Sequence, residues 1–543
     1  MKNTEMGLLL FCLALLLVSC DIGINDKPAT SVPPFVREYS DDTVAVADLD
    51  WPQRVPGRPS CSDSTQKTFE MPDVAEPSGD IVITPSAYLQ PVGVIEKMRL
   101  RLQSSGSEPR DGVLKIDAGN GAVILDSGSL GSVNAALSVR FDTQGSHTIT
   151  AVFAAASDTL RGTVTIAAYA PQLPIVEMTV DEDDYGSILD DPYENISVPA
   201  QFTYDGNRYS CTVRLHGGSS RDYPKKSFRF DLSDSKELPD GCDHIILRAE
   251  WNDKTMLRNY LCCELARQGL WIPVPKAEMV HFRINSRYYG VMWRVERIDG
   301  DFLGARGLNS TIASLYEADP DPECFVPGGD MTPLASDDVY RCVYAQQKGN
   351  LDYKDLKALI EETLLLPDDE FKRTINDVVR VNDMLAYFAF MAVVQNHDHI
   401  RKNYYLYRDP HADDDRWTIV PWDLELTLGH LWTETDDVLD ENIFTDEPLD
   451  FGAVTPPLNA LFVRLYAIDS YRRRFDGMVG HLTGTVFTGS FVDERIDEVL
   501  CGAAPDILAD GNKRADNSEY LARVDEVRRF VEDRRRYIAS VLK

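Results

Sequence analysis

Short runs in which apolar and polar residues alternate fill the chain from about residue 61 to residue 171. Alternation with a period of two is typical of strands that bury one face, and clusters of glycine and serine separate the runs. The pattern predicts a small antiparallel β-sandwich of immunoglobulin-like type over residues 61–171, which we expect to be a spacer or adhesion module. The alternation is clearest at residues 98–102, 113–116, 147–153 and 162–166.

Strand-like runs continue beyond a boundary marked by Pro171 and Pro174. Residues 202–232 alternate in the same way, and the Asp205-Gly206 pair within them is a tight hairpin signal. Apolar residues three and four apart then predict helices at 351–366, 370–394, 458–482 and 521–542. The chain from residue 173 to residue 543 is therefore predicted to be of α+β class, with a mainly β part before a larger, mainly helical part.

One segment interrupts the predicted helices with two short apolar, aromatic runs, at residues 404–407 and 417–421. The polar residues 411–416 lie between them, so the segment predicts a hairpin. Asn403 and Asp423 would then lie at neighbouring ends of that hairpin, with Asp398 just before it.

The first residues of the chain have the pattern of a bacterial lipoprotein signal. An apolar run at residues 7–18 is too short to span a bilayer, and it ends in Leu17-Val-Ser-Cys20, which resembles a lipobox. We expect residues 1–20 to be a signal peptide, lipidated Cys20 to attach the protein to a membrane, and the proline-rich residues 21–60 to be a tether. No later segment is long and apolar enough to span a membrane.

Composition narrows the range of partners. The net charge of −32 argues against a nucleic acid, because phosphate backbones bind basic surfaces. It favours a basic or neutral substrate, although solubility alone accounts for it equally well. Of the ten cysteines, some could pair in an exported protein, and no Cys-x-x-Cys pair indicates zinc.

The candidate chemistry lies in Asp398, Asn403 and Asp423. Their order fits phosphoryl transfer, in which one Asp orients the accepting hydroxyl, an Asn five residues later holds a metal, and a later Asp holds the metal that bridges the phosphates. Carboxylate and carboxamide oxygens are the ligands that magnesium or manganese prefers. Each residue alone would more often be a turn former, but the three together favour an active site.

The segment Asn-x-Asp-x-x-x-x-Asn-Tyr-Tyr-Leu-Tyr, followed by Trp-x-Ile-x-Pro-Trp-Asp-Leu, resembles the core of the spore coat CotH kinase family. Two further blocks, at residues 214–230 and 284–299, resemble family segments in the same order. The resemblance covers residues 173–543 and implies a two-lobed, kinase-like fold that uses ATP with Mg²⁺ or Mn²⁺. It makes Asp398 catalytic and places Asn403, Asp423 and Glu425 on the metal. Gly218 and Glu425 depart from the family pattern, which usually has Asn and Asp there.

The block at residues 214–230 supplies the predicted nucleotide contacts. Ser219, Ser220 and Arg221 lie in a small-residue loop whose backbone N–H groups could approach phosphate oxygens. Strand alternation places Lys226 with the apolar side chains, so it is preferred to Lys225 as the phosphate-binding lysine. The resemblance places Glu296 in the connector beside the adenine.

Further along the chain, Arg258 and Glu264 on a predicted helix are candidates for an ion pair with the phosphate-binding lysine. Solvated charge on the helix face is the other explanation for either residue.

Three functions remain open from the sequence. The first is a protein kinase that acts outside the cytoplasm on a protein at the cell surface or in the periplasm. The second is a surface binding or adhesion lipoprotein that keeps a kinase-like fold without turnover. The third is a metal-dependent hydrolase built on His397, Asp398, His399 and Asp423, which ranks last because no helical His pair completes a zinc ligand set.

Overall fold

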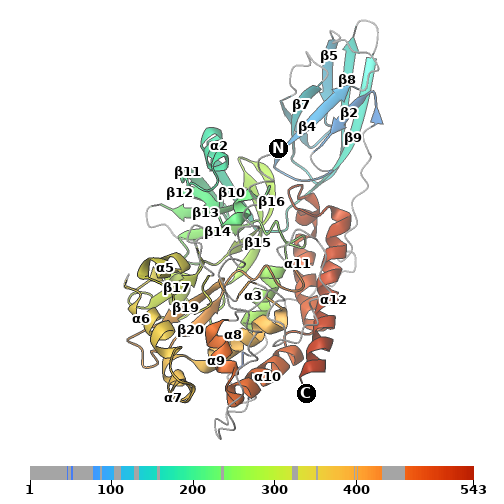
Figure 1. Cartoon of the computed structure of the whole chain (residues 1–543). Helices are drawn as coiled ribbons and strands as arrows, with labels where there is room; N and C mark the ends of the chain where they lie inside the picture. Colours follow the sequence, from blue (N-terminus) through green and yellow to red (C-terminus); the bar gives the residue numbers. More distant parts are fainter. Residues whose placement is uncertain are drawn as a thin grey trace, which may run out of the picture.

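The computed structural model describes residues 46, 51–52, 78–85, 88–102, 112–126, 134–155, 159–233, 238–320, 328–349, 352–396, 398–399, 401–430 and 459–542. They form N-terminal β-sheets, a β-barrel and a mainly helical C-terminal region, which confirms the predicted α+β class (Figure 1). The predicted signal peptide, most of the predicted tether and His397 lie outside the described residues. Among the described helices, none has the length and apolarity of a membrane span.

The N-terminal part consists of two sheets that share one apolar core. One sheet has the order β1-β9-β8-β5, with β3 parallel to β9, and the other has the order β2-β4-β7-β6 with antiparallel pairing. This confirms the predicted antiparallel strands, while the immunoglobulin-like type stays a prediction. The strands are β1 (Ser78–Gly79), β2 (Ile81–Thr84), β3 (Leu89–Pro91), β4 (Ile95–Leu102), β5 (Gly112–Asp117), β6 (Ala122–Asp126), β7 (Asn134–Phe141), β8 (Gly145–Ala155) and β9 (Thr159–Tyr169).

The middle part is a closed barrel in the order β10-β11-β12-β13-β14-β16-β15. Parallel pairing between β10 and β15 closes it, and buried Phe202, Phe230 and Phe282 help to fill its interior. The predicted Asp205-Gly206 turn is confirmed, and both residues have positive φ. The strands are β10 (Ile175–Val180), β11 (Val198–Tyr204), β12 (Asn207–His216), β13 (Ser227–Leu232), β14 (His244–Arg248), β15 (Ala277–Ile284) and β16 (Arg287–Val295), with α2 (Glu182–Asp190) after β10.

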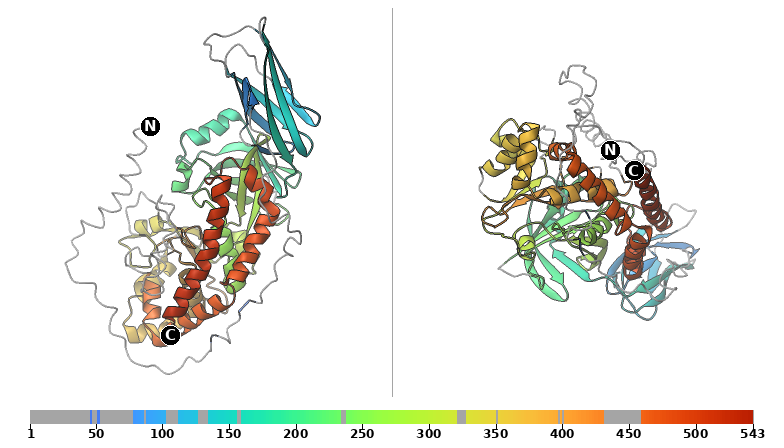
Figure 2. Two further views of the ribbon diagram at one scale, coloured as in Figure 1. Left: turned by 90° about the vertical axis from the view of Figure 1, so that its right-hand side faces the viewer. Right: turned by 90° about the horizontal axis from the view of Figure 1, so that it is seen from below.

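The C-terminal region packs helices around a small sheet, β18-β17-β19-β20. In Figure 2 the last two helices run side by side along one flank of the molecule. The elements are α3 (Arg258–Gly269), α4 (Gly300–Gly304), β17 (Ser314–Ala318), α5 (Asp337–Val343), β18 (Tyr344–Lys348), α6 (Lys354–Lys357), a π-helical turn (Ala358–Thr363), α7 (Asp368–Val378), α8 (Val381–Val394), β19 (Tyr404–Arg408), β20 (Thr418–Pro421), α9 (Ala460–Tyr466), α10 (Asp469–Gly484), α11 (Gly489–Ala509) and α12 (Asn517–Val541).

The prediction of a single helix over residues 370–394 is wrong, because the helix is interrupted between α7 and α8. The backbone there pairs with Trp417 instead: Trp417 N donates to Val378 O, and Arg380 N donates to Trp417 O. The helix predicted at 458–482 is likewise divided into α9 and α10. At the α7–α8 break, the contacts with the distant Trp417 override the helical periodicity.

Part of the predicted tether packs against the helical region. The Trp51 ring stacks on His481 of α10 with ring centroids 3.8 Å apart, and it meets Trp271 edge-on at 5.0 Å. Its Nε1 donates to Val46 O at 2.7 Å, and both residues contact the main apolar core. Residues 46 and 51 therefore belong to the folded body.

Asp506, near the end of α11, joins the three parts of the fold. Its carboxylate accepts hydrogen bonds from Tyr169 Oη at the end of β9, from the Gln172 backbone N–H and from His281 Nδ1 of β15, at 3.0, 3.1 and 2.6 Å. The Asp506 side chain has no solvent exposure. This buried carboxylate thus links the N-terminal sheets to the barrel and to α11, and Ile95 N adds a hydrogen bond to Ser286 O of the barrel at 2.9 Å.

Candidate active site

The β19–β20 hairpin places Asn403 and Asp423 beside each other. Tyr404 pairs with Pro421, and Trp422 N donates to Asn403 O at 3.2 Å, which confirms the predicted hairpin. Both residues have left-handed backbones, with φ of 64° at Asn403 and 49° at Asp423. Non-glycine residues in this conformation are strained and concentrate at functional sites.

Asp398 follows α8 and contacts two residues of the same segment. Its Oδ2 lies 2.9 Å from Asn403 Nδ2 and 2.9 Å from Lys402 Nζ. Because Asn403 donates to Asp398 through nitrogen, its carbonyl oxygen lies on the other side of the carboxamide. Burial lowers the pKa of Lys402, but Asp398 raises it further, so the net shift is upward. Sequence analysis missed Lys402, although its spacing of four residues from Asp398 was visible.

Asp423 and Glu425 lie against a barrel residue that sequence analysis also missed, Arg248 at the end of β14. Arg248 Nη2 is 2.8 Å from Asp423 Oδ1 and 3.3 Å from Glu425 Oε2, and Arg248 Nε is 2.6 Å from Glu250 Oε1. Asn259 Nδ2 of α3 also donates to Glu250 Oε1, at 2.9 Å. The barrel and the hairpin thus meet at a guanidinium that contacts three carboxylates.

In this cluster three carboxylates contact one guanidinium: the Glu250 side chain is 1% exposed, and those of Asp423 and Glu425 are 24% and 22% exposed. Burial raises the pKa of Asp423, but Arg248 lowers it further, and the net shift is downward. Burial and then the charge of Asp423 raise the pKa of Glu425 well above its usual value. Within the described ranges, no group of three or more His, Cys, Asp or Glu residues is arranged to hold a metal ion. The carboxylates of Asp423 and Glu425 contact Arg248 instead.

The loop predicted to approach phosphate follows His216, the last residue of β12. Burial and then the charge of Arg248 lower the pKa of His216 to about 3, so its ring is neutral and lies close to the acidic cluster. Ser219 and Ser220 begin a short 3₁₀ helix, Ser219–Asp222. Arg221 stabilises the loop, because its Nε donates to Gly217 O and its Nη1 to Pro192 O at 3.0 Å.

The alternation predicted for the two lysines is wrong, because β13 begins only at Ser227. Lys225 is the buried lysine, and its Nζ donates to Asp510 Oδ2 at 2.7 Å and to Val291 O at 2.6 Å. Lys226 is partly exposed, and its Nζ donates to Arg221 O. Phosphate binding by Lys226 stays a prediction.

Glu296, the predicted adenine-side residue, pairs with Arg306 Nη2 at 2.7 Å and accepts from Lys276 N at 2.9 Å. Arg258 and Glu264 pair with Asp253 and Arg267, respectively. Glu264 therefore does not form the predicted ion pair with Lys225 or Lys226. Arg258 does not form it either, because it is itself a cation and is paired with Asp253.

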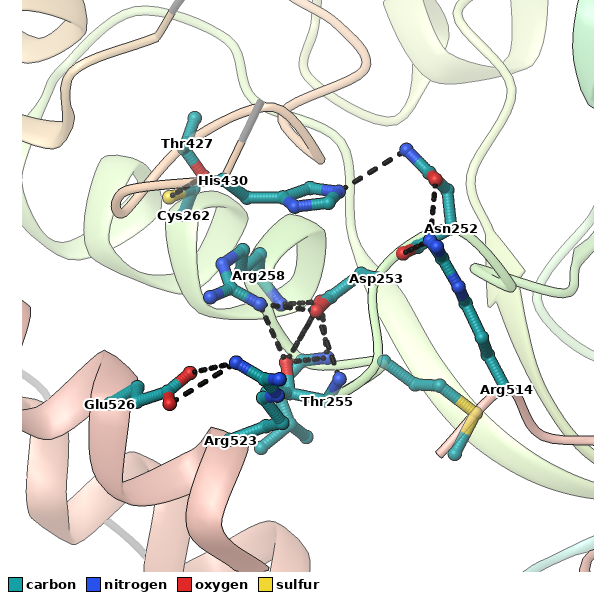
Figure 3. A network of polar contacts seen from close by, with 12 residues as sticks. Asn252, Asp253, Thr255, Arg258, Cys262, Thr427, His430, Arg514, Arg523 and Glu526 are labelled. Atoms are coloured by element: carbon teal, nitrogen blue, oxygen red, sulfur yellow. Dashed lines mark hydrogen bonds and ion pairs between the residues drawn. The ribbon is translucent and has the colours of Figure 1, made fainter. Parts of the chain in front are cut away.

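Figure 3 shows the polar network to which Arg258 belongs. Asp253 accepts from the backbone N–H groups of Thr255 and Arg258 at 2.9 Å each, so it caps the start of α3. The network also reaches His430, 3.2 Å from Asn252 Nδ2. Its role is structural, since it holds α3 and with it Asn259 beside the cluster.

His399, a proposed zinc ligand in the hydrolase alternative, is buried beside Tyr387 and Phe388. Its Nδ1 lies 2.8 Å from Asn396 O, and burial lowers its pKa to about 4. The geometry of the described residues therefore does not favour a zinc hydrolase.

The fold and site together define an α+β protein whose barrel and helical region meet at a buried acidic cluster. A family model described as "CotH kinase protein" matches residues 213–538. The match covers more than half of the 543 residues, and the chain belongs to this family. The chain is also similar to "Inner spore coat protein H" of Bacillus subtilis (strain 168), with 23% identity over 373 residues, 68% of this chain and 98% of that protein.

Proposed function

We propose that this protein is an ATP-dependent protein kinase of the CotH type. Family membership suggests kinase activity. The observation that carries the proposal is the contact between Asp398 and Asn403 at the base of the hairpin that also presents Asp423. In this arrangement the acceptor hydroxyl would contact Asp398, and the metal-bound phosphate chain would lie beside it at Asn403 and Asp423.

The roles follow from the chemistry of each group. Asp398 would orient the acceptor hydroxyl and take its proton. Lys402, 2.9 Å from Asp398, keeps its positive charge and would offset the charge that develops during transfer. Ser219, Ser220 and Arg221 belong to the loop near the phosphates, while Glu296 stays a proposed contact on the adenine side.

The donors suit a divalent cation in type, and a bound cation would have to replace Arg248 at Asp423 and Glu425. Asn403, Asp423 and Glu425 offer only oxygen, the donor that Mg²⁺ and Mn²⁺ prefer. Burial and the charge of Asp423 raise the pKa of Glu425 and favour its protonated form, so binding of a divalent ion there would release its proton. When bound, that ion would neutralise phosphate charge during transfer.

Binding and autophosphorylation together test the proposal. ATP with Mn²⁺ should raise the melting temperature of the wild type, with a stabilisation of about 2.7 kcal/mol at a hundredfold excess over Kd. Labelled phosphate from the γ position should then appear on the protein or on an acceptor protein. Absence of any ATP-dependent stabilisation would refute nucleotide binding and with it the kinase proposal.

A catalytically silent binding protein is the second candidate. It is favoured by one observation, the contact of Arg248 with Asp423 and Glu425, the predicted metal ligands. Stabilisation by ATP without transfer to the protein or to any acceptor would support it.

We further propose that the protein acts outside the cytoplasm, on a basic or neutral protein substrate at the cell surface or in the periplasm. Cys342 and Cys501 each take part in a disulfide bond, and such bonds persist mainly in oxidising compartments. The lipobox-like sequence ending at Cys20 would attach the protein to the membrane. Cys20→Ala should release it into the soluble fraction, and retention of the variant in membranes would refute the lipid anchor.

A further inference from the structure

Arg248 has one fixed contact and one shared contact. Its Nε is paired with Glu250 at 2.6 Å, and Asn259 in turn fixes Glu250. Its Nη2 is shared between Asp423 at 2.8 Å and Glu425 at 3.3 Å. The side chain is 12% exposed, so these contacts form in a largely dehydrated place. The Nε contact anchors the side chain, while Nη2 contacts the groups that a cation would bind.

Arg248 also lies next to the loop that is proposed to approach phosphate. Ala249 N donates to Ser227 Oγ at 3.0 Å, and Ser227 pairs with His216 across the β12–β13 ladder. His216 immediately precedes the loop, and its ring lies in the electric field of both Arg248 and Asp423. The strand that carries Arg248 is therefore joined through Ser227 to the residue that precedes the loop.

The other cations near the loop have different contacts. Lys225 is paired with Asp510, Lys226 donates to Arg221 O, and Arg221 donates to backbone oxygens of the loop and of Pro192. Lys402 is paired with Asp398. Within the part of the chain that the structure describes, Arg248 is the cation in contact with the predicted metal ligands Asp423 and Glu425.

We propose that Arg248 binds the phosphate oxygens of the nucleotide, with Glu250 as its positioning residue. The inference rests on the proposed function. A guanidinium presents a planar fork that matches phosphate, and Glu250 would keep Nε in place while Nη2 exchanges Asp423 for a phosphate oxygen. The same side chain thus neutralises Asp423 in the empty protein and the phosphates in the complex.

The test measures binding of ATP, ADP and adenosine, each with Mn²⁺, to the full chain and its variants by calorimetry. Arg248→Gln should weaken ATP binding about ten- to a hundredfold, ADP binding less and adenosine binding less than about twofold. Glu250→Gln should show the same selectivity with a smaller loss. Arg294→Gln is the matched control, because Arg294 is also paired with two carboxylates, Glu278 and Asp240.

Arg248→Lys guards against a variant that fails to fold, since it keeps the charge but loses the fork. It should recover part of the ATP affinity. An equal loss for ATP, ADP and adenosine would show a structural role and overturn the inference. Tighter ATP binding by Arg248→Gln would also overturn the inference, because it would show that Arg248 prevents the metal from binding and does not bind phosphate. If the wild type binds none of the three, the proposed function itself fails.

Discussion

Lys225 Nζ lies 2.7 Å from Asp510 Oδ2, although the two residues are 285 positions apart. Neither side chain is exposed to solvent. Val291 N also donates to Asp510 Oδ2, at 3.0 Å, and Lys225 donates to Val291 O. The ion pair thus joins the segment just before β13, the middle of β16 and the chain just after α11.

Lys225→Met should therefore lower the free energy of unfolding by about 3–5 kcal/mol, because it leaves Asp510 buried without its cation. The comparison variant is Lys226→Met, whose partly exposed lysine should cost less than about 1 kcal/mol. Denaturant unfolding of both variants checks this. Equal stability of the two variants would contradict the assignment of Lys225 as the structural lysine.

Asp423 and Asp398 should differ in their effects on binding and on transfer. Asp423→Asn should remove Mn²⁺-dependent ATP binding as well as transfer, because a neutral amide is a poorer ligand for a hard cation. Asp398→Asn should leave ATP affinity nearly unchanged and slow transfer by about 10²–10⁴. Calorimetry and autophosphorylation of the two variants check the division. Equal ATP affinity of wild type and Asp423→Asn would contradict the metal assignment.

The Gly217→Ala change should distort the loop. Gly217 has φ of +103°, and a Cβ there would lie 2.1 Å from Ser220 Oγ. The expected cost is about 1–3 kcal/mol of stability, with weaker ATP binding. Gly218→Ala should cost less, since Gly218 has negative φ and nothing within 4 Å of an added Cβ. Thermal unfolding and ATP titration compare the two variants.

His399 should make stability depend on pH in the acidic range. Burial lowers its pKa in the folded protein to about 4, below its ordinary value of 6.5. The unfolded chain therefore binds a proton between these values when the folded protein does not, and stability falls as pH decreases from 6.5 to 4. The total loss is about 3 kcal/mol.

Urea unfolding at a series of pH values measures this loss. His399→Gln should show a flatter pH dependence, whereas the exposed His411→Gln should match the wild type. A wild-type slope in His399→Gln would show that other groups cause the acid sensitivity.

The sequence predicts the hairpin well because its signal is local: two aromatic runs flank a polar turn, and Asn403 and Asp423 must then lie at neighbouring ends. Arg248 was missed because its contact with Asp423 spans 175 positions. Closure of the barrel was missed because it depends on parallel pairing of β10 with β15. The predicted orientation of Lys226, with the apolar side chains, is wrong because the alternation was extended to a residue that precedes the first residue of the strand, Ser227.

The contact between Trp51 and His481 fixes where the chain N-terminal to the sheets meets the folded body. Trp51 lies on α10, whereas the N-terminal sheets lie at the opposite end of the molecule (Figure 1). Any segment upstream of residue 46 would therefore join the folded body at α10. A change made upstream of residue 46 would therefore act at the end of the molecule that is far from the sheets linked through Asp506.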